Sequence, residues 1–176
     1  YNHLYLYNTD GKLIRQLTKG EFVVTEFKGF DKKSERAYYM CTALSPIDRD
    51  LYYVTLSDGK MKRVSGDNGI HSCYYNPENN EVLDVFSNVN TPRKIKLILP
   101  NGSDARTMLT AENPLSEYEL GGMKINTLQS VSGELLYTRT YYPPAMDSLK
   151  QYPVIIYVYG GPHTQLISNS WQGGQG

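Results

Sequence analysis

The chain has 176 residues, of which 40% are hydrophobic and 12% aromatic, so it is long enough to bury a core of one or two domains and is not a disordered segment. Its 18 Lys and Arg residues balance its 18 Asp and Glu residues and form no basic stripe, which argues against nucleic acid or an anionic membrane as a partner. No segment approaches the roughly 20 apolar residues that a membrane-spanning helix requires.

A repeated hairpin pattern occupies the first two-thirds of the chain. An alternating strand runs into Asp-Gly or Asn-Gly and a second strand follows, at residues 3–12, 50–60 and, more weakly, 95–102. Asp, Asn and Gly tolerate the positive φ angles of a type I′ turn, and this pattern is the strongest local signal for a hairpin. Each copy therefore predicts a β-hairpin with a type I′ turn.

Two further strand candidates lie between successive hairpins, at 23–30 and 36–44 and then at 72–76 and 81–87. Four short strands in every ~40 to 50 residues are typical of a β-propeller blade. The pattern predicts one complete blade over residues 23–66, a second over 72–111, and half of another blade before them. Because blades bury their faces against neighbouring blades, we expect unpaired strand edges and self-association when this segment is isolated.

The chain contains 16 tyrosines, many of them in adjacent pairs. Such pairs can form a stacking platform for carbohydrate or bases, but tyrosine also suits half-buried strands, where its ring packs and its hydroxyl reaches water. Because the pairs fall inside predicted strands and no basic groove accompanies them, the structural interpretation is favoured. The pairs are Tyr38-Tyr39, Tyr52-Tyr53, Tyr74-Tyr75 and Tyr141-Tyr142.

The cysteines and histidines give no metal-binding pattern. Cys41 and Cys73 lie in strand-like runs, without the paired spacing of a zinc site or a redox motif. Buried unpaired thiols are favoured for them, and a disulfide stays open because a secreted compartment would permit one. His3, His71 and His163 are too scattered to indicate a metal site, so no metal and no cofactor is predicted.

From Glu112 onward the repeat ends and a different pattern begins. A linker leads to a predicted hairpin formed by 124–128 and 135–142 around the turn 132–134. The apolar run Val154–Tyr159 predicts a third strand, and its continuous hydrophobicity fits a strand that is covered on both faces. It stops at Gly160-Gly161-Pro162, where the glycines permit unusual backbone conformations or close approach by another group.

Two segments then carry a family resemblance. The segment Tyr157-Val158-Tyr159-Gly160-Gly161-Pro162-His163-Thr164-Gln165, with Lys150-Gln151-Tyr152-Pro153 before its strand, resembles the opening of the catalytic domain in the prolyl oligopeptidase family of serine peptidases. Within that family it is most similar to the dipeptidyl peptidase IV branch. The segment Ser45-Pro46-Ile47-Asp48-Arg49-Asp50-Leu51-Tyr52-Tyr53-Val54 resembles a stretch that these enzymes carry late in their β-propeller.

The resemblance implies a mainly β chain with two parts. Residues 1–112 would be the C-terminal blades of a β-propeller. Residues 113–176 would be a linker and the first strands of an α/β-hydrolase catalytic domain. The implied activity is that of a serine exopeptidase that releases dipeptides from peptides with a free N-terminus and Pro or Ala in second position.

One catalytic role is implied within the chain. Family members use a Tyr hydroxyl just before the Gly-rich turn, with a backbone N–H beside the nucleophile, to bind the oxyanion. The matching position is Tyr159, and the alternative is an ordinary aromatic residue that ends a strand. Tyr157 lies on the same side of the strand by alternation and is the competing candidate. Gly160 and Gly161 would shape the turn.

The catalytic triad is expected outside these residues. An α/β-hydrolase places its serine in a Gly-x-Ser-x-Gly elbow, followed along the chain by Asp and His, and the sequence contains no such elbow. Ser103 and Ser132 occupy predicted turns, and His163 comes too early to be the triad base. The glutamates that bind the substrate amine and the proline pocket also belong to other segments in family members, so this chain alone is expected to be inactive.

The resemblance further suggests a homodimeric parent protein that is periplasmic, secreted or membrane-anchored. No signal peptide precedes the first strand-like pattern, so any targeting signal is expected elsewhere. A competing hypothesis from another class is a non-catalytic β-propeller-type module that binds a protein or glycan through its Tyr-rich strands. Tyr159-Gly160-Gly161-Pro162 and the change of pattern near residue 113 favour the peptidase, because a simple binding propeller needs neither.

Overall fold

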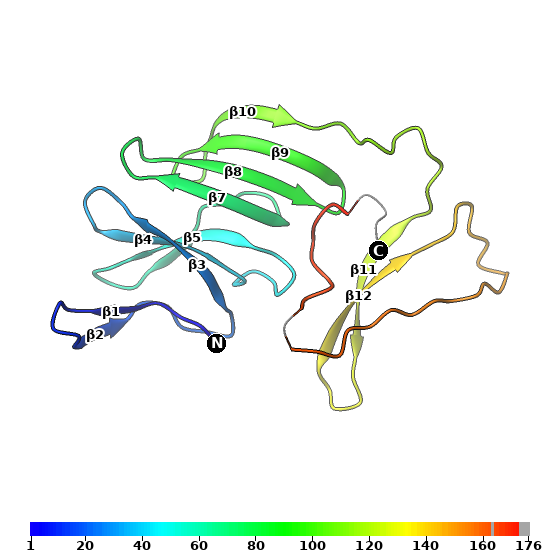
Figure 1. Cartoon of the computed structure of the whole chain (residues 1–176), viewed down its shortest axis with the longest axis horizontal. Helices are drawn as coiled ribbons and strands as arrows, with labels where there is room; N and C mark the ends of the chain where they lie inside the picture. Colours follow the sequence, from blue (N-terminus) through cyan, green and yellow to red (C-terminus); the bar gives the residue numbers. More distant parts are fainter. Residues whose placement is uncertain (163, 173–176) are drawn as a thin grey trace. The chain divides into compact units, whose positions relative to one another are not determined.

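The protein was analysed as a computed structural model that describes residues 1–162 and 164–172, except the side chain of Ala105 (Figure 1). The described residues form twelve β-strands in four antiparallel sheets and include no helix. None of them therefore forms a helix long and apolar enough to cross a bilayer. The chain divides into two compact units, which are residues 1–112 together with the segment from Asn169 onward, and residues 113–168.

The first unit contains one two-stranded and two four-stranded sheets (Figure 1). Within each four-stranded sheet every strand pairs with the next along the chain, which is the meander of a propeller blade. The predicted half blade and two complete blades are therefore confirmed as sheets. The sheets are β1 (Tyr5–Tyr7) with β2 (Leu13–Gln16); β3 (Val24–Phe30), β4 (Arg36–Cys41), β5 (Asp50–Thr55) and β6 (Met61–Arg63); and β7 (Ile70–Asn76), β8 (Glu81–Asn88), β9 (Thr91–Ile98) and β10 (Asp104–Thr110).

The three predicted hairpins form, but their turns are not of type I′. Gly11, Gly59 and Gly102 adopt φ of 79°, 72° and 91°, whereas the described non-glycine residues at positive φ lie elsewhere, at Ser34, Asn80 and Ala145. In the first turn the Gly11 N–H donates to the Asn8 carbonyl at 3.0 Å and the Asn8 N–H donates to Lys12 at 2.9 Å. The loop is one residue longer than a type I′ turn, so only its last residue needs positive φ.

The core of the first unit is built around β4, whose two faces are both buried. Ala37, Tyr39 and Cys41 pack into a cluster that includes Leu17, the residue that follows β2. Tyr38 and Met40 point the other way, into a cluster shared with the β7–β10 sheet. This is the two-residue alternation of a strand placed between neighbours on both sides.

Burial of the tyrosine pair on β4 confirms the structural interpretation for it. Tyr38 and Tyr39 have no solvent-exposed surface. The Tyr38 ring stacks on Tyr75 with centroids 4.2 Å apart, so aromatic side chains join the two four-stranded sheets. Cys41 and Cys73 are both buried and free, as the sequence predicted.

The second unit contains the predicted hairpin. Strand β11 (Met123–Gln129) pairs with β12 (Leu135–Tyr141) through seven consecutive residue pairs. The turn between them has the same form as the first hairpin, since the Gly133 N–H donates to Ser130 at 3.0 Å and the Ser130 N–H donates to Glu134 at 2.8 Å. Gly133 supplies the positive φ, at 91°.

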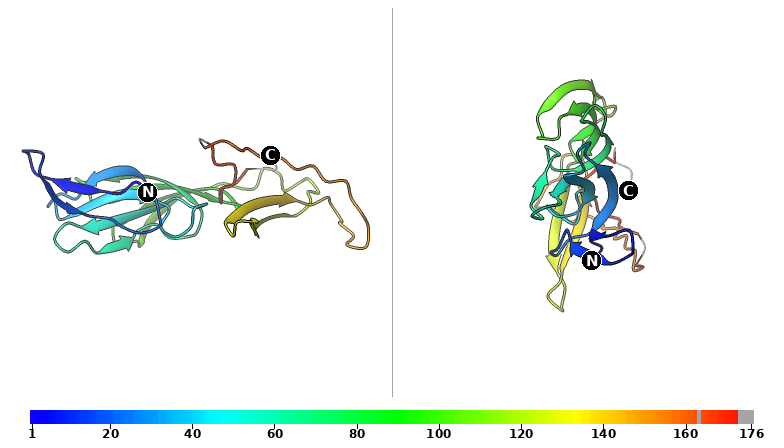
Figure 2. Two further views of the ribbon diagram at one scale, coloured as in Figure 1. Left: turned by 90° about the horizontal axis from the view of Figure 1, so that it is seen from below. Right: turned by 90° about the vertical axis from the view of Figure 1, so that its left-hand side faces the viewer.

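The predicted strand Val154–Tyr159 is wrong for this structure. No arrow is drawn over this segment in Figures 1 and 2, and no described residue pairs with it in a sheet. Its side chains stay exposed, with Ile155 at 96% and Val154 at 78%. A strand forms by hydrogen bonding to a neighbouring strand, and among the described residues neither outer edge of the β11–β12 hairpin pairs with this run. The predicted opening of an α/β-hydrolase sheet is thus not seen as a sheet.

Candidate functional site

The predicted oxyanion donor lies at the end of the exposed apolar run. Tyr159 is 46% exposed and Tyr157 is 77% exposed, and neither hydroxyl forms a hydrogen bond with another described residue. His163 lies outside the described residues. The role of Tyr159 therefore stays a prediction from the sequence.

In the Gly-rich turn, one of the glycines lies close to the Tyr159 side chain. A Cβ placed on Gly161 would lie 2.6 Å from the Tyr159 hydroxyl oxygen, whereas a Cβ on Gly160 would meet nothing within 4 Å. Neither residue has φ in the left-handed region. The sequence suggested two reasons for glycine here, which were an unusual backbone conformation and close approach by another group. Only close approach applies, at Gly161, and the approaching group is the Tyr159 side chain.

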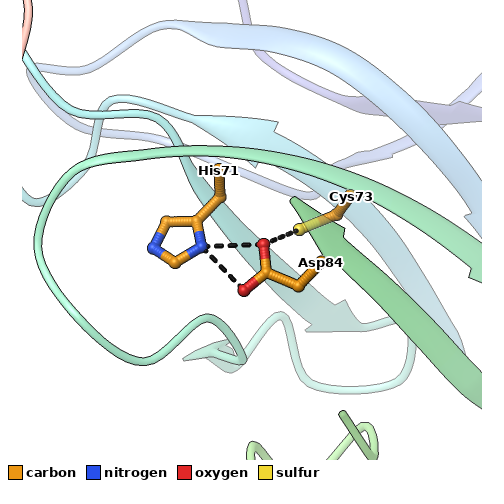
Figure 3. A group of neighbouring side chains, drawn as sticks. All are labelled: His71, Cys73 and Asp84. Carbon is orange, nitrogen blue, oxygen red and sulfur yellow. Dashed lines mark hydrogen bonds and ion pairs between the residues drawn. The ribbon is translucent and has the colours of Figure 1, made fainter. Parts of the chain in front are cut away.

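A second group of reactive side chains, which the sequence did not reveal, is buried in the β7–β10 sheet. His71 and Cys73 lie two residues apart on β7 and so share one face, and Asp84 of β8 is paired directly with Cys73. The three side chains meet beneath the strands, with the carboxylate between the imidazole and the thiol (Figure 3). All three are buried, with relative exposures of 4%, 0% and 3%.

Hydrogen bonds in this group indicate a charged histidine. The His71 Nδ1 lies 2.9 and 3.0 Å from the two Asp84 oxygens, and Nε2 lies 2.8 Å from the Asp67 carbonyl oxygen. Because all three partners are acceptors, both ring nitrogens donate and the ring is an imidazolium. Burial by itself lowers the pKa of His71, but the hydrogen bond and charge of Asp84 outweigh burial and raise that pKa.

The thiol in this group stays protonated. Burial, followed by the negative charge of Asp84, raises the pKa of Cys73 well above its ordinary value. The Cys73 Sγ is 3.5 Å from Asp84 Oδ1 and donates to it. Cys73 is therefore an inert buried thiol and not a nucleophile.

The same three side chains carry atoms of the kinds that bind metal ions. One ligand atom each from His71, Cys73 and Asp84 falls within 4.8 Å of the others. These are the same atoms that hydrogen-bond to one another, so a metal ion would have to displace the His71–Asp84 bonds and remove the Cys73 proton. The arrangement therefore works as a charge-paired network. The three histidines are scattered along the sequence, but the pairing of β7 with β8 brings Asp84 next to His71 and Cys73.

The network continues into the neighbouring sheet. The Asp67 carbonyl also accepts from Arg63 Nη2 at 2.8 Å, and Arg63 donates through Nε and Nη2 to Asp50 Oδ1 at 2.9 and 2.7 Å. Asp50 is fully buried on β5, and the Ser65 hydroxyl donates to the same oxygen at 2.9 Å. Charged and polar groups thus join the β3–β6 sheet to the β7–β10 sheet beside the shared apolar cluster.

Comparison with known proteins places the chain in a family. A family model described as the dipeptidyl peptidase IV N-terminal region matches residues 1–93, which is more than half of the chain. The chain belongs to the dipeptidyl peptidase IV family. Residues 1–93 include the half blade, the β3–β6 sheet, and strands β7 and β8 of the next sheet.

Relatives of the dipeptidyl peptidase IV family match nearly the whole chain. Dipeptidyl peptidase 4 of Arthroderma otae is 30% identical over 97% of this chain, which spans 23% of that relative. A crystal structure titled as a putative dipeptidyl aminopeptidase IV from Bacteroides ovatus is 30% identical, with a TM-score of 0.87, over 99% of this chain and 28% of that one. The crystal structure of Porphyromonas gingivalis dipeptidyl peptidase 4 has the same fold as this chain, with a TM-score of 0.87. The two are 22% identical, and the match covers 96% of this chain and 24% of that one.

Proposed function

We propose that this chain is part of a serine exopeptidase that releases N-terminal dipeptides from peptides with Pro or Ala in second position. The observation that carries the proposal is the similarity to a relative named dipeptidyl peptidase 4, which covers 97% of the chain and so extends well beyond the family match at residues 1–93. Residues 1–112 would supply propeller blades. Residues 113–176 would supply a linker and the first strands of an α/β-hydrolase domain.

Within these residues the proposed catalytic group is Tyr159. As a serine attacks the substrate carbonyl, negative charge develops on the carbonyl oxygen, and donors aimed at that oxygen stabilise the transition state. The Tyr159 hydroxyl would be one donor, and a backbone N–H beside the nucleophile would be the other. Ser, Asp and His of the triad are proposed to lie in other segments of the full-length protein, which agrees with the lack of a Gly-x-Ser-x-Gly elbow here.

The structure offers no support for the competing glycan- or protein-binding module at the β4 tyrosines. Tyr38 and Tyr39 are buried between sheets and present no surface to a ligand. Tyr74 is 61% exposed, and the Lys28 Nζ lies 5.5 Å from the centroid of its ring. Its neighbour Tyr75 packs on Tyr38 instead, so the two adjacent tyrosines form no stacking platform.

The proposal is tested with the full-length protein that contains this chain. We expect it to release p-nitroaniline from Gly-Pro-p-nitroanilide, to lose activity with a serine-directed phosphonate, and to leave N-acetylated Gly-Pro-p-nitroanilide intact. The matched control is the 1–176 chain alone, which should be inactive. Equal cleavage of the free and acetylated substrates would contradict an exopeptidase that binds a free amine.

A further inference from the structure

The Tyr159 side chain lies against the turn that follows it. The five preceding residues of the apolar run, 154–158, are between 76% and 96% exposed, whereas Tyr159 is 46% exposed. A Cβ on Gly161 would lie 2.6 Å from both the Cζ and the hydroxyl oxygen of Tyr159, and 2.8 Å from its Cε1. The end of the tyrosine ring that carries the hydroxyl therefore occupies the space that a side chain at Gly161 would need.

The two adjacent glycines of this turn differ in their surroundings. A Cβ on Gly160 would meet nothing within 4 Å, whereas a Cβ on Gly161 would meet the Tyr159 ring. Neither glycine has φ in the left-handed region, so an alanine at either position carries no penalty for a positive φ. The contact with Tyr159 thus distinguishes Gly161 from Gly160.

Pro162 limits how the turn could make room for a larger residue. Proline fixes its own φ and disfavours the helical region for the residue before it, which here is Gly161. The Tyr159 side chain is half-exposed, and its χ1 changes between staggered positions about 120° apart. A methyl group at position 161 is therefore accommodated more readily by rotation of the Tyr159 side chain than by movement of the backbone, and this rotation carries the hydroxyl to another place.

We propose that Gly161 is a positioning residue for the peptidase reaction: because it has no Cβ, it admits the Tyr159 ring against the turn and so sets the position of the Tyr159 hydroxyl. This inference rests on the proposed function, and both residues belong to the second unit. An oxyanion donor must lie about 2.7–3.1 Å from the developing oxyanion. Misplacement by about 1 Å can cost as much as roughly 10²-fold in rate.

The first test compares the two glycines in the full-length enzyme. Gly161→Ala should lower kcat for Gly-Pro-p-nitroanilide by roughly 10- to 100-fold and leave KM within about threefold of wild type, because negative charge on the carbonyl oxygen develops only as the transition state is approached. The melting temperature should change little, because the half-exposed ring rotates into solvent. A fall in melting temperature without a fall in kcat would show a structural role and overturn the proposal.

Two other glycines serve as controls for the added methyl group. Gly160→Ala tests the same turn and should lower kcat by less than about threefold, since its methyl group meets nothing within 4 Å. Gly122→Ala lies outside the turn, also has open space at its Cβ, and should leave kcat unchanged. Equal kcat values for the Gly160→Ala and Gly161→Ala enzymes would overturn the positioning role while leaving the peptidase intact.

The second test asks whether Gly161 acts through the Tyr159 hydroxyl. Once Tyr159→Phe has removed that hydroxyl, Gly161→Ala should cost less than about threefold in kcat, because no donor is left to misplace. A loss of the same size in both backgrounds would assign Gly161 a role independent of Tyr159 and would contradict the proposal.

A last variant covers the case in which Gly161→Ala melts below the assay temperature. Adding Tyr159→Ala removes the ring that meets the new methyl group and should restore the melting temperature. No recovery would overturn the contact on which the inference depends. An inactive wild-type full-length protein would instead overturn the proposed function, and the role of Gly161 with it.

Discussion

Two runs that the sequence predicts as strands have opposite outcomes in this molecule. β4 (Arg36–Cys41) is paired along both edges, with β3 and β5, and buried on both faces. All six residues of Val154–Tyr159 are β-branched or aromatic, against two in β4, yet this run forms no strand and stays exposed. The difference lies in the neighbours and not in the runs. Hydrophobicity specifies that a segment favours burial, but only other segments decide whether it is buried.

This comparison suggests that the two units respond differently to substitution. In the first unit, contacts among the described residues already fix the side chains. In the second unit, the apolar run pairs with no strand among those residues, so the consequences of changing it depend on the rest of the full-length protein. We therefore expect the losses of stability and activity below, from the largest to the smallest.

The largest effect is expected from removing the charge partner of Asp84. His71→Phe retains an aromatic ring beside Phe86 but leaves a buried carboxylate without its imidazolium, so we expect the 1–176 chain to lose about 3–5 kcal/mol in its free energy of unfolding. Urea denaturation followed by circular dichroism measures this loss. Adding Asp84→Asn removes the uncompensated charge and should recover part of the stability. No recovery would show that packing, and not charge pairing, dominates at this site.

The next effect concerns catalysis at the unpaired run. Tyr159→Phe in the full-length enzyme removes one oxyanion donor and keeps the ring, so we expect kcat to fall about 10²–10³-fold, or roughly 3 to 4 kcal/mol. Active-site titration and a proline-containing dipeptide substrate give kcat, with melting curves to check folding. Tyr157→Phe is the matched control and should cost little. Wild-type activity in Tyr159→Phe would remove the catalytic role assigned to this turn.

A third prediction compares the same kind of truncation in the two regions. Leu51 on β5 is fully buried between the four-stranded sheets, so Leu51→Ala should destabilise the 1–176 chain by about 3 kcal/mol. Ile155 is 96% exposed, so Ile155→Ala should change the stability by less than about 0.5 kcal/mol. If the run becomes a covered strand in the full-length enzyme, Ile155→Ala should become destabilising there. Denaturant titrations of both proteins test this difference.

A smaller effect is expected from pH. The pKa of His71 is raised in the folded chain, so the stabilisation from its charge is complete below the unfolded pKa of about 6.5 and is lost as the pH rises through the folded pKa. The melting temperature of the 1–176 chain should therefore decrease as the pH rises above about 6.5. The loss should be smaller than that in His71→Phe, because neutral imidazole still donates one hydrogen bond. A variant lacking His71 should not show this part of the pH dependence.

The smallest effect is expected at an exposed ion pair. Lys32 Nζ lies 3.0 Å from Glu78 Oε2, and their side chains are 69% and 74% exposed. Solvent screening limits such a pair to about 0–1 kcal/mol, so Lys32→Ala should shift the melting temperature only slightly. Raising the salt concentration should weaken the pair further. A loss comparable to that of His71→Phe would contradict the idea that burial gives the His71–Asp84 pair its importance.

Several elements could be predicted from the sequence because their signals are local. Alternating side chains and the Asp-Gly and Asn-Gly pairs located the hairpins, and their spacing located the two four-stranded sheets. The turn type was wrong because those dipeptides do not determine the length of the loop. In the loop that forms, Asn8 and Lys12 close the ends and Gly11 alone takes positive φ.

The sequence by itself determined the order and approximate places of the strands in the first unit, because strand alternation and turn residues act over a few neighbouring positions. Only the tertiary structure decided which strand is covered on both faces, as for β4, and which run is left uncovered, as for Val154–Tyr159. It also joined Asn169 to Asp48 across 121 positions of the chain. Such contacts depend on how sheets pack, which residue spacing along the chain does not encode.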